Sequence, residues 1–173
     1  MLLHVLILDF WLYWWHRINH QWSLLWRFHR IHHLDSWLDT TSALRFHFGE
    51  VLLSAVARLP VILLLGISFT SVLAYEAVIL LCAIFHHSNI RLPLMVENGL
   101  SKLIITPGIH WVHHHAIRRD TDSNYGTLFS FWDRLFATRS STVRFSDMPI
   151  GVEAEPEQKM GHLLLMPVGV CRT

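Results

Sequence analysis

FHRIHH, residues 28–33, is the stretch around which the rest of the chain is organised. If it is helical, His29, His32 and His33 stand at positions i, i+3 and i+4, so their imidazoles leave one face of the helix. Each neutral imidazole can offer a ring nitrogen to a metal ion. This segment is therefore predicted to be a metal-binding helix.

Two further histidine sets have related spacings. HWVHHH, which starts at His110, places His113 and His114 at i+3 and i+4. An earlier HxxxH pair consists of His16 and His20. With 14 histidines in 173 residues, one HxxHH triple arises by chance in roughly one chain in ten, and two triples are much rarer. The pair and the two triples supply eight imidazoles, which indicates two metal ions, or one ion surrounded by additional histidines.

The overall composition is that of a membrane protein. A length of 173 residues suggests one domain, and the mean hydropathy of +0.35, with 52% hydrophobic and 16% charged residues, lies outside the usual globular range. The formal net charge of +1 gives no indication of a nucleic-acid partner. Two cysteines, Cys82 and Cys171, make no disulfide framework, which argues against a disulfide-built secreted protein.

Three apolar segments, about 2–16, 51–67 and 69–87, are predicted to be membrane helices. The first is short for a full span, which takes about 20 apolar residues, so it is either a shallow segment or part of a chain that begins further upstream. It fits a signal peptide less well because it lacks a basic start and a small-residue cleavage site. The other two are joined at residues 66–68 and are expected to form a hairpin, with Ser68 as the N-cap of the second helix.

The second leg of this hairpin returns His86 and His87 to the side of the other histidine sets. These two side chains differ by about 100° around a helix, and we expect His87 to be the ligand, with His86 beside the site or at the interface. The turn of the hairpin is uncharged, so the positive-inside tendency puts the histidine side in the cytoplasm. The basic residues on that side are Arg17, Arg27, Arg30, Arg45, Arg91, Lys102, Arg118 and Arg119.

Arg58 and Glu76 are two charges inside the predicted hairpin. They lie about nine residues before and after the centre of the turn, so antiparallel helices would hold both at similar depth, roughly 13 Å from it. An unpaired charge at such depth is costly, and we therefore predict an ion pair. Glu76 also precedes His87 by eleven residues, about three helical turns, so it is expected to lean toward the face of that histidine.

A carboxylate also occurs in the first apolar segment. Asp9, Tyr13, His16 and His20 share a narrow arc of a helix, because separations of 4, 7 and 11 residues are nearly whole turns. Asp9 is therefore expected to face the histidines. The alternative is that it pairs with an interfacial arginine.

The remaining histidines are weaker candidates. His47 precedes Glu50 by three residues in RFHFGE and is either a ligand or an interfacial histidine. His115 lies about 140° from His110 around a helix, which favours a place beside the site or on the surface. His162 stands alone in the polar tail, in which we expect little chemistry.

Taken together, these residues resemble the fatty acid hydroxylase/sterol desaturase superfamily, the histidine-box non-haem di-iron membrane oxygenases. The resemblance covers 9–138 through DFWLYWWHRINH, LWRFHRIHH, HFGE, HHSN, HWVHH and NYGTLFSFWDRLFAT. Phe48 stands where proline is usual and Ala137 where glycine is more frequent, and the family's upstream membrane helices have no counterpart. The resemblance implies an all-α integral membrane helical bundle with a histidine-rich metal site on the cytoplasmic side, formed by residues 1–138 and followed by a polar tail at 139–173.

The resemblance also implies two iron ions, a lipid or sterol-like substrate and its hydroxylation or desaturation with O₂. Imidazoles alone suit zinc, copper and nickel as well, so the choice of iron rests on the resemblance. The sequence has no GxGxxG fingerprint, which implies an external electron donor, a cytochrome b5- or ferredoxin-like protein with its reductase. The ligands carried over are His16, His20, His29, His32, His33, His87, His110, His113 and His114, with His47 as a further candidate.

Other functions compete with this interpretation. A metalloprotease is disfavoured because HRINH, residues 16–20, lacks the glutamate of HExxH. A non-oxygenase membrane protein that binds haem through two histidines is disfavoured because haem ligands normally come singly from facing helices rather than as HxxHH triples. A metal-storage protein, or a histidine-rich surface with incidental spacing, is the remaining alternative.

Overall fold

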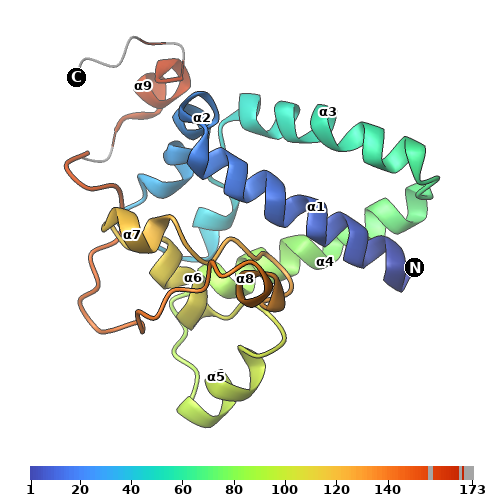
Figure 1. Cartoon of the computed structure of the whole chain (residues 1–173). Helices are drawn as coiled ribbons and strands as arrows, with labels where there is room; N and C mark the ends of the chain where they lie inside the picture. The colour runs from blue at the N-terminus through green and yellow to red at the C-terminus, as the bar shows by residue number, and fades with distance from the viewer. Residues whose placement is uncertain (156–157, 168, 170–173) are drawn as a thin grey trace.

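The computed structural model describes residues 1–155, 158–167 and 169 (Figure 1). Within these ranges every regular element is helical, with only isolated β-bridges between loops, which confirms the all-α prediction. The elements are α1 (Leu2–Gln21), α2 (Ser23–His33), the 3₁₀ helix η1 (Thr40–Leu44), α3 (Phe48–Leu64), α4 (Phe69–His87), α5 (Leu94–Leu100), α6 (Pro107–His113), α7 (Arg118–Thr121), α8 (Phe131–Leu135) and α9 (Met160–Leu165).

α1 and α2 form the centre of the histidine-bearing end. The backbone leaves the helical conformation at Trp22, with φ −94° and ψ 115°, and this break lets α2 turn against the end of α1. The buried face of α1 includes Tyr13, His16 and His20, as the predicted arc requires. The helix continues five residues beyond the predicted 2–16, so both members of the HxxxH pair lie on one continuous helix.

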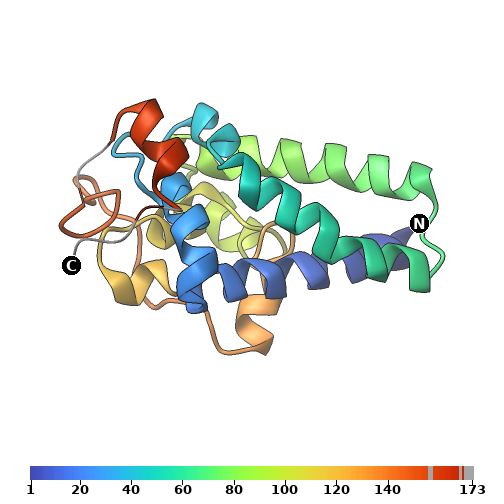
Figure 2. The ribbon, with the colours of Figure 1, turned by 90° about the horizontal axis from the view of Figure 1, so that it is seen from above.

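α3 and α4 form the predicted hairpin, with α3 beginning three residues earlier than expected. Gly66, with φ +60°, takes the left-handed conformation that the turn requires and that glycine adopts without strain. Ser68 caps α4 as predicted, because its Oγ accepts a hydrogen bond from the Ser71 backbone N–H. Figures 1 and 2 show the two helices meeting at this turn and spreading apart away from it, and in Figure 1 α1 runs between them.

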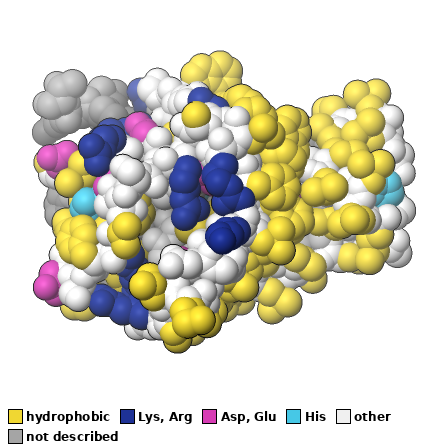
Figure 3. All heavy atoms as spheres, turned by 60° about the horizontal axis from the view of Figure 1, so that its bottom comes forward, with side chains coloured by type: hydrophobic (Ala, Val, Ile, Leu, Met, Phe, Trp, Pro, Cys, Tyr) yellow, Lys and Arg dark blue, Asp and Glu magenta, His cyan; other side chains and the backbone are white. Residues whose placement is uncertain are grey.

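The hairpin is strongly apolar on its outside. Val56 and Leu63 on α3, and Leu73 and Leu81 on α4, are all exposed. Figure 3 shows hydrophobic side chains along this end of the molecule, whereas the charged side chains visible on that face gather over the other part. Among the described residues α4 is the one helix long and apolar enough to cross a membrane. The predicted spans 2–16 and 51–67 therefore remain predictions.

The two charges in the hairpin meet as predicted. The Arg58 guanidinium on α3 and the Glu76 carboxylate on α4 form an ion pair across the hairpin. Arg58 also lies over the ring of Trp11 on α1, with its Cζ 5.8 Å from the ring centroid. Three helices are therefore joined at this level, and neither charge is left unpaired in an apolar setting.

Asp9 does not face the histidines, and among the described residues it forms no ion pair with an arginine. Its carboxylate accepts hydrogen bonds from the backbone N–H groups of Leu128 and Phe129, at 3.3 and 3.2 Å, and from Trp132 Nε1 at 2.8 Å. The predicted arc is correct, but a buried carboxylate binds the N–H groups that tertiary packing brings to it. Asp9 therefore fastens the loop before α8 to α1.

The tail beyond residue 138 packs on the histidine-bearing end. Leu163 of α9 joins a small core with Ile31 and Leu34 of α2, and Arg30 forms an ion pair with Glu155 at 3.2 Å. The division into 1–138 and a polar tail remains a prediction. Of the two cysteines, Cys82 is free, and Cys171 lies outside the described residues.

Candidate metal centre

Nine of the ten predicted ligands meet in two groups of buried imidazoles. In each group one ring nitrogen from every histidine lies within 4.8 Å of the others. The first group consists of His16 and His20 from α1, His29 and His33 from α2, and His113 from α6. The second group consists of His32 from α2, His87 from α4, His110 from α6 and His114 at the end of α6.

Each HxxHH triple is divided between the two groups. On α2, His29 and His33 are four residues apart and join the first group, while His32 points to the second. On α6 the division is reversed, because His110 and His114 join the second group and His113 the first. Residues at i and i+4 lie closest on one helical face, which explains why these pairs stay together. The two helices therefore bridge both groups.

Distances between ring nitrogens fit metal ligands. The Nε2 atoms of His32 and His110 lie 3.1 and 3.0 Å from Nε2 of His87, and those of His110 and His114 lie 3.1 Å apart. In the first group Nε2 of His16 lies 3.1 Å from Nε2 of His29. With metal–nitrogen bonds of about 2.1 Å, two ligands at a right angle are separated by about 3.0 Å. These nitrogens are therefore spaced as neighbouring ligands of one ion would be.

The buried nitrogens are also chemically ready for a cation. Both ring nitrogens of His33, Nε2 of His113 and Nδ1 of His114 are buried and have no hydrogen-bond partner in the part of the chain that the structure describes. Burial lowers the pKa of His33 and His114 well below the usual histidine value, and that of His113 to about 3. The rings are therefore neutral at physiological pH and keep lone pairs to donate. Because buried polar atoms are rarely left unpaired, a metal ion in the first group would satisfy Nε2 of His113 and one nitrogen of His33.

Backbone carbonyls orient several of these rings. The Nδ1–H groups of His16 and His113 donate to the carbonyls of Tyr125 and Ser123, at 2.8 and 2.6 Å. The Nδ1–H of His87 donates in the same way to Ala83, at 2.8 Å. A hydrogen bond at Nδ1 fixes the tautomer and turns Nε2 toward the common centre, as is usual for metal-binding histidines.

Glu50 is a functional candidate that the sequence interpretation missed. Its Oε1 lies 2.7 Å from Nδ1 of His29, and both side chains are buried. A carboxylate that accepts this hydrogen bond increases the basicity of the imidazole as a ligand. The signal for it in the sequence is the HFGE motif, residues 47–50, which ends in this glutamate.

His47 lies outside both groups. Its Nδ1 accepts a hydrogen bond from the Gly49 backbone N–H at 3.0 Å, and its Nε2–H donates to the Leu164 carbonyl at 3.2 Å. The ring therefore caps α3 and holds α9, and both of its nitrogens are used. His47 was predicted to be either a ligand or an interfacial histidine, and the structure does not bring it to the other ligands.

The remaining histidines also lie outside the groups. His86 is buried against His110, with ring centroids 4.0 Å apart, which fits the predicted position beside the site. The Nδ1–H of His115 donates to the Asp120 carboxylate at 2.8 Å, and this ring too is buried. His162 is exposed on α9.

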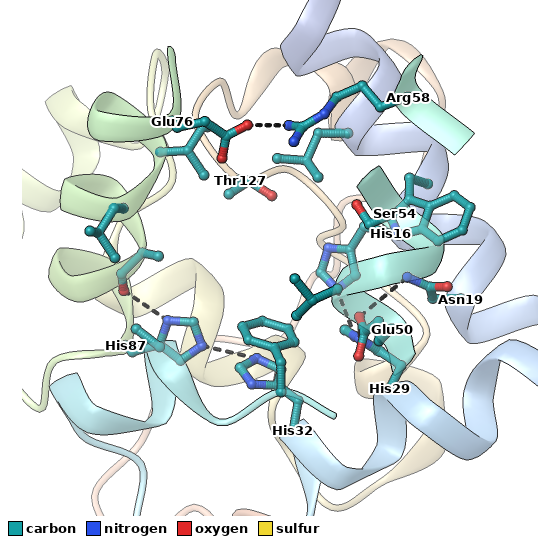
Figure 4. Close-up of a pocket in the computed structure, with 18 of the residues that line it drawn as sticks. His16, Asn19, His29, His32, Glu50, Ser54, Arg58, Glu76, His87 and Thr127 are labelled. Carbon is teal, nitrogen blue, oxygen red and sulfur yellow. Dashed lines mark hydrogen bonds and ion pairs between the residues drawn. The ribbon is translucent and has the colours of Figure 1, made fainter. Parts of the chain in front are cut away.

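A cavity of about 320 Å³ opens above both groups. His16 and His29 of the first group and His32, His87 and His110 of the second contribute to one end of it. The Arg58–Glu76 pair lies across the cavity from His32 and His87 (Figure 4). Between these ends the walls are mainly apolar, and they include Leu12, Val51, Ala55, Ile79, Leu80 and Ala83.

The chain is similar in sequence to lipid-modifying enzymes. It is 32% identical over 153 residues to the ornithine lipid hydroxylase OlsE of Rhizobium tropici, covering 88% of this chain and 45% of the relative. It is 32% identical over 127 residues to the alkylglycerol monooxygenase of Danio rerio, covering 73% and 27%. It is also 28% identical over 166 residues to a very-long-chain aldehyde decarbonylase of Oryza sativa subsp. indica, covering 90% and 26%.

The chain thus spans less than half the length of these curated relatives. No solved structure is significantly similar to it. The family model described as fatty acid hydroxylase matches residues 1–138, which contain all nine histidines of the two groups. Together with the resemblance of the histidine motifs, these matches establish that the chain belongs to the fatty acid hydroxylase family.

Proposed function

We propose that the protein is a membrane-bound di-iron oxygenase that hydroxylates a C–H bond of a lipid. The observation that carries the proposal is the position of the histidines, because both groups lie at one end of an apolar-walled cavity. The ornithine lipid hydroxylase and the alkylglycerol monooxygenase among its relatives support a lipid substrate and an oxygenase reaction. Desaturation of the same type of substrate is the alternative outcome.

The two histidine groups would each hold one iron ion. When bound, iron supplies the redox chemistry that activates O₂. The protein contributes neutral nitrogen ligands, and their orientation is set by carbonyls and by Glu50. Burial of the rings also excludes bulk water from the reacting end of the cavity.

The cavity would bind the hydrocarbon chain of the substrate. Its volume of about 320 Å³ is at the lower end of the range for small-molecule sites. Leu12 on α1, Val51 on α3, and Ile79 and Leu80 on α4 provide an apolar surface along it. A chain held there by apolar contacts would present one of its methylene groups to the histidine end.

Electrons would come from a partner protein of the cytochrome b5 or ferredoxin type with its reductase. The sequence itself has no GxGxxG fingerprint for a flavin or nicotinamide cofactor. The basic residues beside the histidines support a metal centre on the cytoplasmic side of the membrane, where such donors are available.

Metal and product analysis together test this function. The full chain would be isolated from membranes in detergent with iron supplied, and its metal content measured. It would then be incubated with a lipid extract, a reduced electron donor and isotopically heavy O₂. We expect two irons per chain and a product that has gained one heavy oxygen atom.

The outcomes separate the competing functions. A product that has lost two hydrogen atoms without gaining oxygen indicates a desaturase. A haem absorbance band, or a chain that binds metal but consumes no O₂ with any lipid fraction, rejects the oxygenase. His162→Ala is the matched control, because this histidine is exposed and belongs to neither group, and it should leave metal and product unchanged.

A further inference from the structure

The Arg58–Glu76 pair occupies a position that structural support alone does not explain. Both residues line the cavity, and Figure 4 shows the pair facing it from the side opposite His32 and His87. The Arg58 side chain is 16% exposed and that of Glu76 44% exposed. The pair is thus a charged feature in a mainly apolar cavity, and it is open to a molecule within it.

The hydrogen-bonding capacity of the pair is only partly used. Nη1 of Arg58 contacts the Glu76 carboxylate, and the buried Nε of Arg58 has no hydrogen-bond partner among the described residues. The ring of Trp11, below the guanidinium, holds this group in place without accepting a conventional hydrogen bond. Because both side chains line the cavity and Glu76 is 44% exposed, a polar ligand can reach the pair without breaking it.

Stability is a weak reason for such a pair. Apolar residues of similar volume often replace a buried ion pair with no loss of stability, because two charges need not then be desolvated. The hairpin could have joined α3 to α4 with apolar side chains, as it does near the turn, where Ile62 and Val72 pack against one apolar cluster. The charges therefore point to a ligand.

We propose that Arg58 and Glu76 are positioning residues that bind a polar group of the lipid substrate and thereby select the carbon that is oxidised. This inference rests on the proposed function. The protein would then bind two parts of the substrate, its polar group at the Arg58–Glu76 pair and its hydrocarbon chain along the apolar walls.

The pair selects the chemistry of that polar group. It carries one cation and one anion, so an anionic phosphate would meet Glu76 and a cationic amine would meet Arg58, each with a repulsive contact. A group that is neutral and both donates and accepts hydrogen bonds can engage Arg58 and Glu76 together. An amide has this property, and we assign the site to amide-bearing lipids.

The geometry also sets the distance between the two parts. Along α3, Arg58 lies eight residues after Glu50, which bonds to His29, a rise of about 12 Å. Along α4, Glu76 lies eleven residues before His87, a rise of about 16 Å. The oxidised carbon is therefore well down the chain from the polar group.

The first test measures the position of the new hydroxyl group. The iron-loaded chain would receive saturated fatty amides of three chain lengths and, for comparison, hexadecane. We expect a hydroxyl at a constant number of carbons from the amide, whatever the chain length, and a scattered set of products from hexadecane. Positions that are constant when counted from the methyl end would overturn the proposal.

The informative variant is the double change Arg58→Met/Glu76→Leu, because it removes the polar site without leaving an unpaired charge. We expect scattered hydroxyl positions and an unchanged metal content. The KM for hexadecanamide should rise about tenfold, which is the effect of losing one or two hydrogen bonds. Arg58→Glu/Glu76→Arg keeps both charges and should restore much of the wild-type pattern. Glu155→Gln, which breaks the outer pair with Arg30, is the matched control and should change nothing.

A binding measurement keeps this inference separate from the proposed function. Trp11 lies under Arg58 and Trp15 lines the cavity, so tryptophan fluorescence can follow lipid binding without turnover. The wild-type chain should bind hexadecanamide more tightly than hexadecane, palmitate or hexadecylamine, and the Arg58→Met/Glu76→Leu variant should lose this preference. Equal preference in both proteins overturns the inference even if hydroxylation is found, whereas a preference without any product overturns only the oxygenase.

Discussion

The two ends of the cavity differ in how far their polar groups are paired within the protein. At the histidine end, nine buried imidazoles from α1, α2, α4 and the α6 region face one another, and several of their nitrogens have no partner among the described residues. At the hairpin end, two full charges satisfy each other. The first arrangement is incomplete without a cation, whereas the second is neutral by itself. Unpartnered nitrogen lone pairs suit a cation, whereas a pair of balanced charges suits a neutral ligand.

The largest expected effect comes from replacing one histidine of either group, which should remove the ion of that group alone. His113→Ala should empty the first group and His32→Ala the second, because each variant removes one ligand of that group. We expect one iron per chain instead of two in each variant, with activity reduced by at least about 100-fold. Metal analysis on the purified variants checks this. Loss of both ions from either variant would mean that the two groups form a single cooperative site.

The hairpin end should respond through stability. Arg58→Ala or Glu76→Ala leaves one charge unpaired in an apolar setting, which should cost about 2 kcal/mol of unfolding free energy, less than a fully buried pair because Glu76 is 44% exposed. The double alanine variant should recover much of this loss. Thermal unfolding in detergent micelles measures all three. Additive losses in the double variant would refute the pairing.

Glu50 tests whether the histidine end depends on its carboxylate. Glu50→Gln keeps the size of the side chain but weakens the hydrogen bond to His29. We expect about tenfold weaker metal binding at the first group and no change at the second. Titration of the metal-free protein with ferrous iron would reveal two classes of site. An unaltered titration would exclude Glu50 from the metal centre.

The smallest expected effect distinguishes a ligand from a helix cap. His47→Ala should leave two irons bound and lower the unfolding free energy by about 1 kcal/mol, because α3 loses its N-cap. His47→Asn should recover part of the stability, since asparagine is a good N-cap. If His47→Ala instead loses iron, the histidine is a ligand and must move toward the groups when metal binds.

Local patterns predicted much of this molecule. The spacing of His29, His32 and His33 correctly indicates a helix that presents imidazoles, and the apolar runs around Gly66 indicate a hairpin. The depth of Arg58 and Glu76 followed from counting residues along two helices of known rise. Each of these features depends on neighbours within one helix or one turn.

Contacts between distant segments could not be predicted in this way. Periodicity defines where a side chain points around its own helix axis, but not which other helix lies there. The division of each triple between two groups, the capping role of His47, and the bonding of Asp9 to the loop before α8 all depend on that packing. Local sequence patterns thus account for the helices, the hairpin and a supply of nitrogen ligands. Which histidines gather into one group, and what faces them across the cavity, follows from the tertiary structure alone, because both are properties of the contacts between helices.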